Sequence, residues 1–158
     1  MNISSASSEI LVVDANIAVW AVLPLVAEIP TLDRLEQWHH QQRRILAPAL
    51  WIAEAVSVIR LLVYKKLLTA AEGEQAIDDL FALEIETLPL TQPLCQLAFL
   101  WASKLQQARA YDSMYLALAE QKNAWLWTAD KRLVNGARQR GFLHISWIGA
   151  DEIADQIA

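Results

Sequence analysis

Short β-branched runs alternate along the chain with longer segments in which apolar residues recur every three or four positions. The short runs predict strands and the longer segments predict helices. We expect strands at 10–13, 45–47, 85–88, 125–128 and 144–148, and helices at 16–23, 32–42, 49–66, from 69 onward, 92–108, 112–122 and 130–140. This alternation predicts a short, mostly parallel sheet in a three-layer α/β/α domain.

Local signals place several helix ends. Thr69 is followed three residues later by Glu72, which is the pattern of a capping box at a helix start. Gly141 stands where the helix 130–140 should end. Because the chain contains no internal repeat and no linker rich in Gly, Ser or Pro, we expect one domain over 10–158, preceded by a flexible N-terminal segment at 1–9.

Composition narrows the function classes. The chain has 158 residues, 55% of them hydrophobic, so it can bury a core and does not have the composition of a disordered chain. No apolar run approaches the roughly 20 residues that cross a bilayer, and the N-terminal segment carries no Lys or Arg, unlike a signal peptide. The single cysteine excludes an intrachain disulfide framework. We therefore expect a cytoplasmic protein without a membrane partner, and the net charge of −5 argues against electrostatic coating of nucleic acid.

Two aspartates follow predicted strands. Asp14 comes after the strand 10–13 and Asp130 after the strand 125–128. In parallel sheets, ligands bind beyond the carboxyl ends of the strands, so both side chains are candidate metal ligands. The alternative for each is a helix N-cap, which is a common role of Asp after a strand-to-helix turn.

Two further acids lie in predicted helices. Glu54 has Leu50, Trp51, Val58 and Leu61 as helical neighbours, so it lies on an apolar stripe where an unpaired carboxylate is costly. It either pairs with an arginine elsewhere or faces a metal ion. Asp112 opens the helix 112–122, where it is a helix cap, a metal ligand, or both.

Phosphodiester hydrolysis explains why four acids would be gathered. One or two divalent ions activate water, neutralise the phosphate and stabilise the leaving oxygen. Hard cations such as Mg²⁺ select oxygen ligands. Without such ions the acids would repel each other, because two like charges about 4 Å apart interact by about 4 kcal/mol at an effective dielectric constant of about 20.

Four sequence blocks resemble the PIN domain family, in particular its toxin-like subgroup of the VapC kind. They are Val-Val-Asp-Ala-Asn-Ile at 12–17, the segment 47–57 around Glu54, Tyr-Asp-Ser-Met-Tyr-Leu-Ala-Leu-Ala-Glu at 111–120, and Trp-Thr-Ala-Asp-Lys-Arg-Leu at 127–133. Their order and spacing fit from about residue 10 to 148, and the last two blocks together are the specific signal.

The resemblance implies a Mg²⁺- or Mn²⁺-dependent endoribonuclease, the toxin of a type II toxin–antitoxin pair. It places the family's four catalytic, metal-binding acids on Asp14, Glu54, Asp112 and Asp130. Asn16, Thr128 and Ser113 are then expected to orient carboxylates or water. The resemblance further implies a homodimer, an RNA substrate and a separate antitoxin protein.

Three basic residues near the acids are candidates for binding RNA. Arg109, Lys131 and Arg132 could hold RNA phosphates, although a solvated helix face is an equal alternative.

Some relatives carry another acid shortly after the last one, whereas Lys131, Arg132 and Leu133 follow Asp130 here. A second metal site is therefore expected to be weak or filled only together with substrate.

Two other functions remain open at this stage. A phosphatase could form an aspartyl-phosphate on Asp14, but that chemistry commonly uses a second acid two residues later, where this chain has Asn16. A catalytically silent interaction module could retain only the fold, although the presence of all four acids counts against it.

Overall fold

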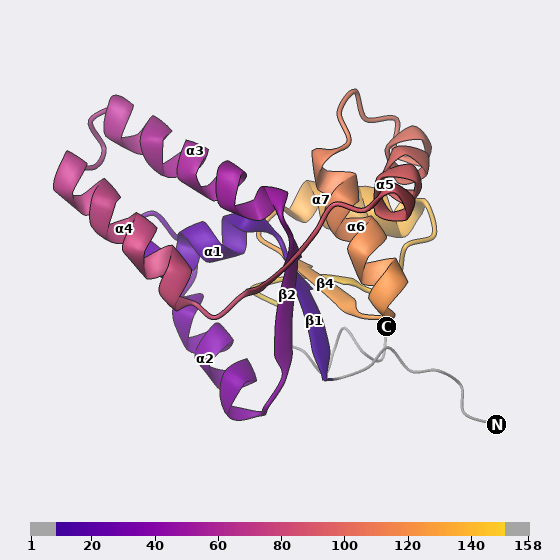
Figure 1. Cartoon of the computed structure of the whole chain (residues 1–158), viewed down its shortest axis with the longest axis horizontal. Coiled ribbons are helices and arrows are strands. Elements are labelled where there is room, and N and C mark those ends of the chain that lie inside the picture. Colours follow the sequence, from indigo (N-terminus) through magenta and orange to yellow (C-terminus); the bar gives the residue numbers. More distant parts are fainter. Residues whose placement is uncertain (1–8, 151–158) are drawn as a thin grey trace.

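The structure is a computed structural model, and it describes residues 9–150. Within these residues a five-stranded sheet is surrounded by seven helices (Figure 1). The strands are β1 (Ile10–Val13), β2 (Arg44–Pro48), β3 (Glu86–Leu88), β4 (Trp125–Thr128) and β5 (Ile145–Trp147). The helices are α1 (Ala15–Val22), α2 (Leu32–His40), α3 (Leu50–Tyr64), α4 (Ala70–Ala82), α5 (Gln92–Lys104), α6 (Tyr111–Lys122) and α7 (Lys131–Gln139).

The sheet is parallel throughout and has the strand order β3-β2-β1-β4-β5. The strand order reverses between β1 and β4. On one side β1 pairs with β2, the next strand in the sequence, and on the other side it pairs with β4, which comes much later. This reversal is the topological switch point at which parallel α/β sheets bind ligands. The predicted α/β class and parallel sheet are confirmed.

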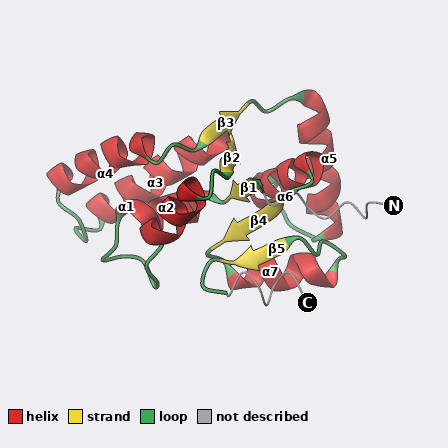
Figure 2. Cartoon of the chain, turned by 90° about the horizontal axis from the view of Figure 1, so that it is seen from below, coloured by secondary structure: helices red, strands yellow, loops and turns green. Residues whose placement is uncertain are grey.

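The middle of the sheet is buried because helices cover both of its faces (Figure 2). The helix α6 packs on β1, β2 and β4, with α5 packed on α6, while α1 and α2 pack on the opposite side. Three residues of β1 are accordingly at most 1% exposed: Leu11, Val12 and Val13. A strand buried on both faces reads as a continuous apolar run, which explains the pattern of this segment.

The helices α3 and α4 form an antiparallel arm that extends away from the sheet (Figure 1). Thr69 starts α4 with the predicted capping box, since its hydroxyl accepts from the Glu72 amide and the Glu72 carboxylate accepts from the Thr69 amide. Gly73 lies where α4 approaches α3, and a Cβ there would come within 2.7 Å of a Val63 methyl group. The arm therefore depends on a defined helix start and a small residue at the contact.

Most predicted elements lie within two residues of their observed positions, with two differences. The helix α5 ends at Lys104 instead of continuing to 108, and residues 105–110 form a connection to α6. Asp112 is not an N-cap, because α6 begins at Tyr111 with Ala110 in the capping position and without a side-chain cap. Residues 1–8, most of the predicted N-terminal segment, lie outside the described residues, as do 151–158. Over the described part, no helix combines the length and apolarity needed to span a membrane.

We expect Thr69→Ala to lower the free energy of unfolding by about 1 kcal/mol, the usual cost of losing a helix N-cap. The reason is that the substitution removes the hydroxyl that accepts from the Glu72 amide. Urea denaturation followed by circular dichroism measures the loss, and Thr69→Ser is the control that retains the hydroxyl. An unchanged midpoint in Thr69→Ala would mean that the capping box does not stabilise the arm.

Candidate active site

The switch point places the ends of β1 and β4 side by side. Asp14 follows β1 directly, and its amide donates to the carbonyl oxygen of Trp127 in β4 at 3.0 Å. Asp130 follows β4 after one intervening residue, Ala129. Both aspartates occupy N-cap positions, but only Asp130 caps with its side chain, accepting from the amides of Arg132 and Leu133. Of the two aspartates, only Asp130 therefore serves as the side-chain N-cap that the sequence allowed. Both capping bonds go to Oδ1, so its Oδ2 accepts neither of these amides.

Thr128 joins the two strand ends through its buried hydroxyl group. The hydroxyl donates to Oδ2 of Asp14 at 2.9 Å and accepts from the Asp130 amide at 3.1 Å. The side-chain amide of Asn16 donates to the same hydroxyl at 3.5 Å and accepts from the Ala129 amide at 3.1 Å. These bonds fix the orientation of the Asp14 carboxylate relative to the turn that carries Asp130.

Glu54 lies in the second turn of α3 and is held by Tyr115 of α6. The Tyr115 hydroxyl donates to Oε1 of Glu54 at 2.6 Å, and Tyr115 is 0% exposed. The arginine partner considered from the sequence is thus replaced by a buried phenol. Burial first, and then the nearby charges of Asp14 and Glu54, raise the pKa of Tyr115, so it remains a hydrogen-bond donor.

Asp112 reaches the site from the first turn of α6. The Gln107 side chain donates to Oδ2 of Asp112 at 3.4 Å. Ser113, which is completely buried, donates in turn to the Gln107 side chain at 3.1 Å. Ser113 therefore contacts Asp112 through Gln107, a residue of the connection between α5 and α6.

All four acids line one cavity of about 240 Å³. Burial first, and then the charge of Asp112, raise the pKa of Asp14 from 3.8 to about 7. Burial, followed by the charge of Asp112, also raises the pKa of Glu54, and burial, followed by the charge of Asp130, raises that of Asp112. Each raised pKa therefore reflects first the cost of burying a charged carboxylate and then its repulsion by a neighbouring acid.

The carboxylates surround the cavity without forming a closed metal cage. Across residues 9–150, no three acidic, histidine or cysteine side chains are arranged as ligands of one ion. The donor set is nevertheless made of oxygen atoms only, and no Lys or Arg belongs to the described residues that line the cavity. Such a set fits a hard cation that keeps part of its water shell.

The three basic residues predicted to hold RNA do not line this cavity. Arg109 and Arg132 are exposed, in the connection before α6 and in the first turn of α7. The ammonium group of Lys131 lies 4.0 Å from the centre of the Trp147 ring, in a cation–π contact. Their binding to RNA stays a prediction.

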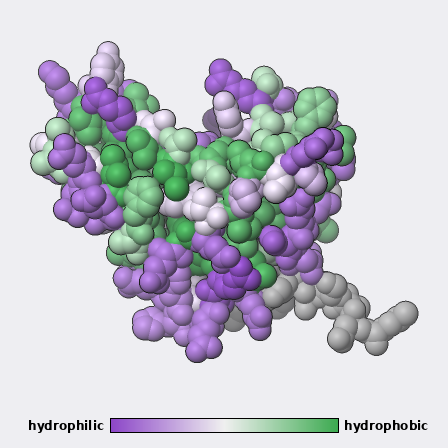
Figure 3. All heavy atoms as spheres, in the orientation of Figure 1, coloured by the Kyte–Doolittle hydropathy of each residue, from purple (hydrophilic) through white to green (hydrophobic). Residues whose placement is uncertain are grey.

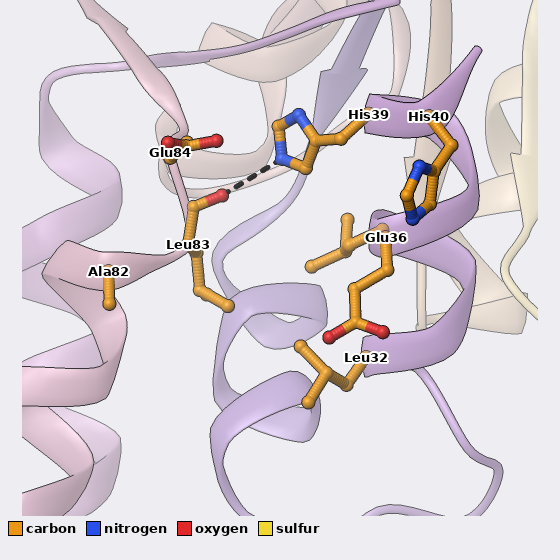
Figure 4. Close-up of a pocket in the computed structure, with 8 residues that line it drawn as sticks. Leu32, Glu36, His39, His40, Ala82, Leu83 and Glu84 are labelled. Atoms are coloured by element: carbon orange, nitrogen blue, oxygen red, sulfur yellow. Dashed lines mark hydrogen bonds between the residues drawn. The ribbon is translucent and has the colours of Figure 1, made fainter.

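A larger cavity of about 530 Å³ lies between α2 and the end of α4 (Figure 4). His39 contacts the Leu83 carbonyl oxygen at 3.0 Å there, whereas His40 and Glu36 lie one helical turn apart along α2. None of the four site acids lines this cavity. Its polar groups are therefore separate from the switch point, and His39 joins two helices.

Sequence reasoning missed Tyr115 and Gln107 as partners of the acids. Tyr115 follows Asp112 by three residues, so helical spacing places it near the same face. Nothing in the sequence indicates that its hydroxyl meets Glu54 of α3, because that contact depends on how α3 and α6 pack. Gln107 lies in a segment that the sequence assigned to a helix.

The acidic side chains thus converge at the switch point of an all-parallel α/β sheet, which is where such sheets bind ligands. The PIN domain family model matches residues 11–139, and the chain belongs to this family. The resemblance in the four sequence blocks is thereby confirmed.

Solved structures of the same fold come from bacteria and an archaeon. VapBC2 from Rickettsia felis, bound to a DNA fragment from its promoter, has a TM-score of 0.62 and 16% identity over 87% of this chain and 98% of that chain. PAE2754 from Pyrobaculum aerophilum has a TM-score of 0.60 and 19% identity, covering 85% and 83%. VapC20 from Mycobacterium tuberculosis, described as a toxin that cleaves the sarcin–ricin loop, has a TM-score of 0.54 and 16% identity, covering 78% and 92%. No curated protein sequence matches the chain.

We expect Asp14→Asn to stabilise the metal-free protein at high pH. The folded-state pKa of Asp14, about 7, lies above the unfolded value of 3.8, so the folded state binds more protons and stability falls as the pH rises through this interval. Because each pKa unit corresponds to ~1.4 kcal/mol, the variant should gain about 2–4 kcal/mol in EDTA at about pH 8.

Denaturant unfolding at about pH 8 and at about pH 4 measures this gain, most of which should be lost at the lower pH, because Asp14 is then protonated in the folded state and the pH is close to its unfolded pKa of 3.8. Asp78→Asn is the matched control, since Asp78 is exposed on α4. A less stable Asp14→Asn protein at the higher pH would contradict the assignment of a costly buried charge.

Proposed function

We propose that the chain is a metal-dependent endoribonuclease and the toxin of a toxin–antitoxin pair. The single observation that carries this proposal is the convergence of Asp14, Glu54, Asp112 and Asp130 on one cavity at the switch point of a PIN domain. Asp14 is 6% exposed, and burial, followed by the charge of Asp112, raises its pKa to about 7; a bound cation would offset the cost of ionising it.

Mg²⁺ and Mn²⁺ suit this donor set. Mg²⁺ usually binds one or two carboxylates and completes its shell with water and substrate phosphate, so it needs no cage of three protein ligands. Asp14, Glu54, Asp112 and Asp130 would hold the ions. Bound divalent ions supply an activated water and neutralise the phosphate and the leaving oxygen.

The other residues keep the acids in place. Thr128 and Asn16 orient Asp14 and the turn before Asp130. Gln107, buttressed by Ser113, donates to Asp112. Residues that orient metal ligands in this way commonly contribute about 10–100-fold to metal affinity or activity.

An aspartyl-phosphate mechanism is less well supported. The Asp14 carboxylate is engaged by Thr128, and Asn16 occupies the position of the second acid. A lysine that could neutralise an acyl-phosphate is missing from the cavity lining over the described residues. The nuclease is therefore favoured over the phosphatase.

The antitoxin partner is supported by two of the fold neighbours. VapBC2 from Rickettsia felis is described as bound to a DNA fragment from its promoter, and a further neighbour is described as a toxin–antitoxin complex from Klebsiella pneumoniae, with a TM-score of 0.57 and 13% identity. We propose that a separate protein covers the cavity of this chain in the same kind of complex. The homodimer stays a prediction from the family resemblance.

The test is to incubate the purified protein with structured and unstructured RNA in Mn²⁺ or EDTA, beside Asp112→Asn. We expect cleavage that requires metal and falls by at least about 100-fold in the variant, because a direct metal ligand is removed. Asp78→Asn should retain full activity. Cleavage that survives in Asp112→Asn would exclude this site, and failure to bind Mn²⁺ by calorimetry would indicate a silent module.

Removal of the Tyr115 hydroxyl tests how Glu54 is held. We expect Tyr115→Phe to weaken Mn²⁺ binding by about 10-fold, because Glu54 loses its 2.6 Å donor. Tyr111→Phe is the control, since Tyr111 lies in the same helix and is exposed. Calorimetry with Mn²⁺ measures the effect, and equal affinities in the two variants would show that Tyr115 does not position Glu54.

A further inference from the structure

A third cavity, with a volume of about 280 Å³, lies at the opposite edge of the sheet from the acids. It is lined by Trp101 of α5, by Glu120 near the end of α6, by the turn before β4 and by residues 141–144, which connect α7 to β5. The acids lie near the start of α6 and just after β4, whereas this cavity lies at the end of α6 and the start of β4. The cavity is therefore separate from the candidate active site.

Two buried aromatic rings form one wall of this cavity. Trp101 is 6% exposed and Phe142 is 7% exposed. The centres of the two rings are 5.3 Å apart and their planes are inclined at 89°, which is an edge-to-face contact. Because both rings are packed into the core, their positions are fixed before any ligand arrives, and such preorganisation lowers the entropic cost of binding.

Glu120 supplies a carboxylate beside these rings. Its Oε2 accepts from the indole N–H of Trp101 at 2.6 Å. Over residues 9–150, no second donor contacts this carboxylate. A carboxylate offers about four acceptor positions, so Glu120 is held in place by Trp101 and still has acceptor positions for a ligand.

The charges around the cavity favour a cation as the ligand. The described residues that line it include no Lys or Arg, and the chain as a whole has a net charge of −5, which attracts cations. The ammonium group of Lys104 lies 4.5 Å from the centre of the Trp101 ring, although Lys104 does not line the cavity. The indole therefore already takes part in one cation–π contact.

The size and position of the cavity favour a small ligand. In the space-filling view, hydrophobic residues gather over the α3–α4 arm and the hollow beside it, whereas the cavity lies at the end of α6 (Figure 3). Its volume of about 280 Å³ is close to the lower end of the range for ligand pockets, about 300–1,000 Å³. It therefore suits a small molecule or a single side chain.

We propose that this cavity binds a guanidinium group carried on a short apolar stem. A guanidinium is planar, packs against aromatic rings and forms two parallel hydrogen bonds with a carboxylate. The Trp101 ring and the Glu120 carboxylate are the two groups that would select it, and Phe142 and Leu143 would contact the stem. This site does not depend on the proposed nuclease function.

The test is to titrate the protein with n-butylguanidinium and with n-butylurea, which has nearly the same shape but no charge. We expect a Kd on the order of 1 mM for the guanidinium by calorimetry, and binding of the urea that is at least about 10-fold weaker. NMR of the indole N–H groups locates the site. Among the signals of the seven tryptophans, that of Trp101, assigned with Trp101→Phe, should shift with the guanidinium because its N–H donates to Glu120.

Glu120→Gln is the decisive variant, because it removes the charge and keeps an oxygen that can accept from Trp101. We expect it to weaken guanidinium binding by at least about 10-fold. Glu74→Gln is the matched control, since Glu74 is exposed on α4 and does not line the cavity, and it should bind as the unaltered protein does.

Equal affinities for the guanidinium and the urea, or a Trp101 indole signal that does not move, would overturn the proposal. Binding that survives in Glu120→Gln and disappears in Asp112→Asn would also overturn it, because the cation would then occupy the acidic cavity. N-acetylarginine amide distinguishes the two sources of a guanidinium. Binding at least as tight as that of n-butylguanidinium would support the site with an arginine side chain as its ligand, and binding that is at least about 10-fold weaker would support it with a free small molecule.

Discussion

In the middle of the sheet, β1 is hydrogen-bonded to β4, a strand that comes more than a hundred residues later, and the site depends on this pairing. The bond from the Asp14 amide to the Trp127 carbonyl oxygen continues the pairing one residue beyond β1. The Thr128 hydroxyl then connects side chains that are 114 residues apart in sequence. With the two strand ends fixed, the helices α3 and α6 need only pack on their proper faces to bring Glu54 and Asp112 to the same cavity.

The gathered acids act against the stability of the fold that gathers them. Asp14 is almost completely buried, and its pKa is raised to about 7. The pKa values of Glu54 and Asp112 are raised as well. The surrounding polar groups offset part of this cost by donating hydrogen bonds to the carboxylates. A site of this kind persists where binding energy from cations or substrate compensates for the strain, which is the usual relation between stability and function at active sites.

The fold was largely predictable because β-branched runs and helical periodicity are local properties. The strand 10–13 and the capping box at Thr69 each depend on residues that are close together in the sequence, and both are observed. The positions of Asp14 and Asp130 follow from the rule for strand ends. Contacts between distant elements could not be predicted. The hydrogen bond from Tyr115 to Glu54 joins residues 61 positions apart. The apolar residues that line the acidic cavity come from α1, α3 and the loop between α1 and α2. Those contacts depend on helix packing, which periodicity does not specify.

The dual role of Asp130 has an evolutionary consequence. One of its carboxylate oxygens accepts from two amides at the start of α7, so its loss would weaken a helix end as well as the site. Asp14 has the opposite character, because its side chain caps nothing and its charge is costly. In a lineage released from selection for catalysis, drift should therefore erode the acids unequally: Asp14 would be replaced early, and Asp130 would remain as a relic long after activity had disappeared. An aspartate that persists at this turn would therefore say less about catalysis than an aspartate that persists at position 14.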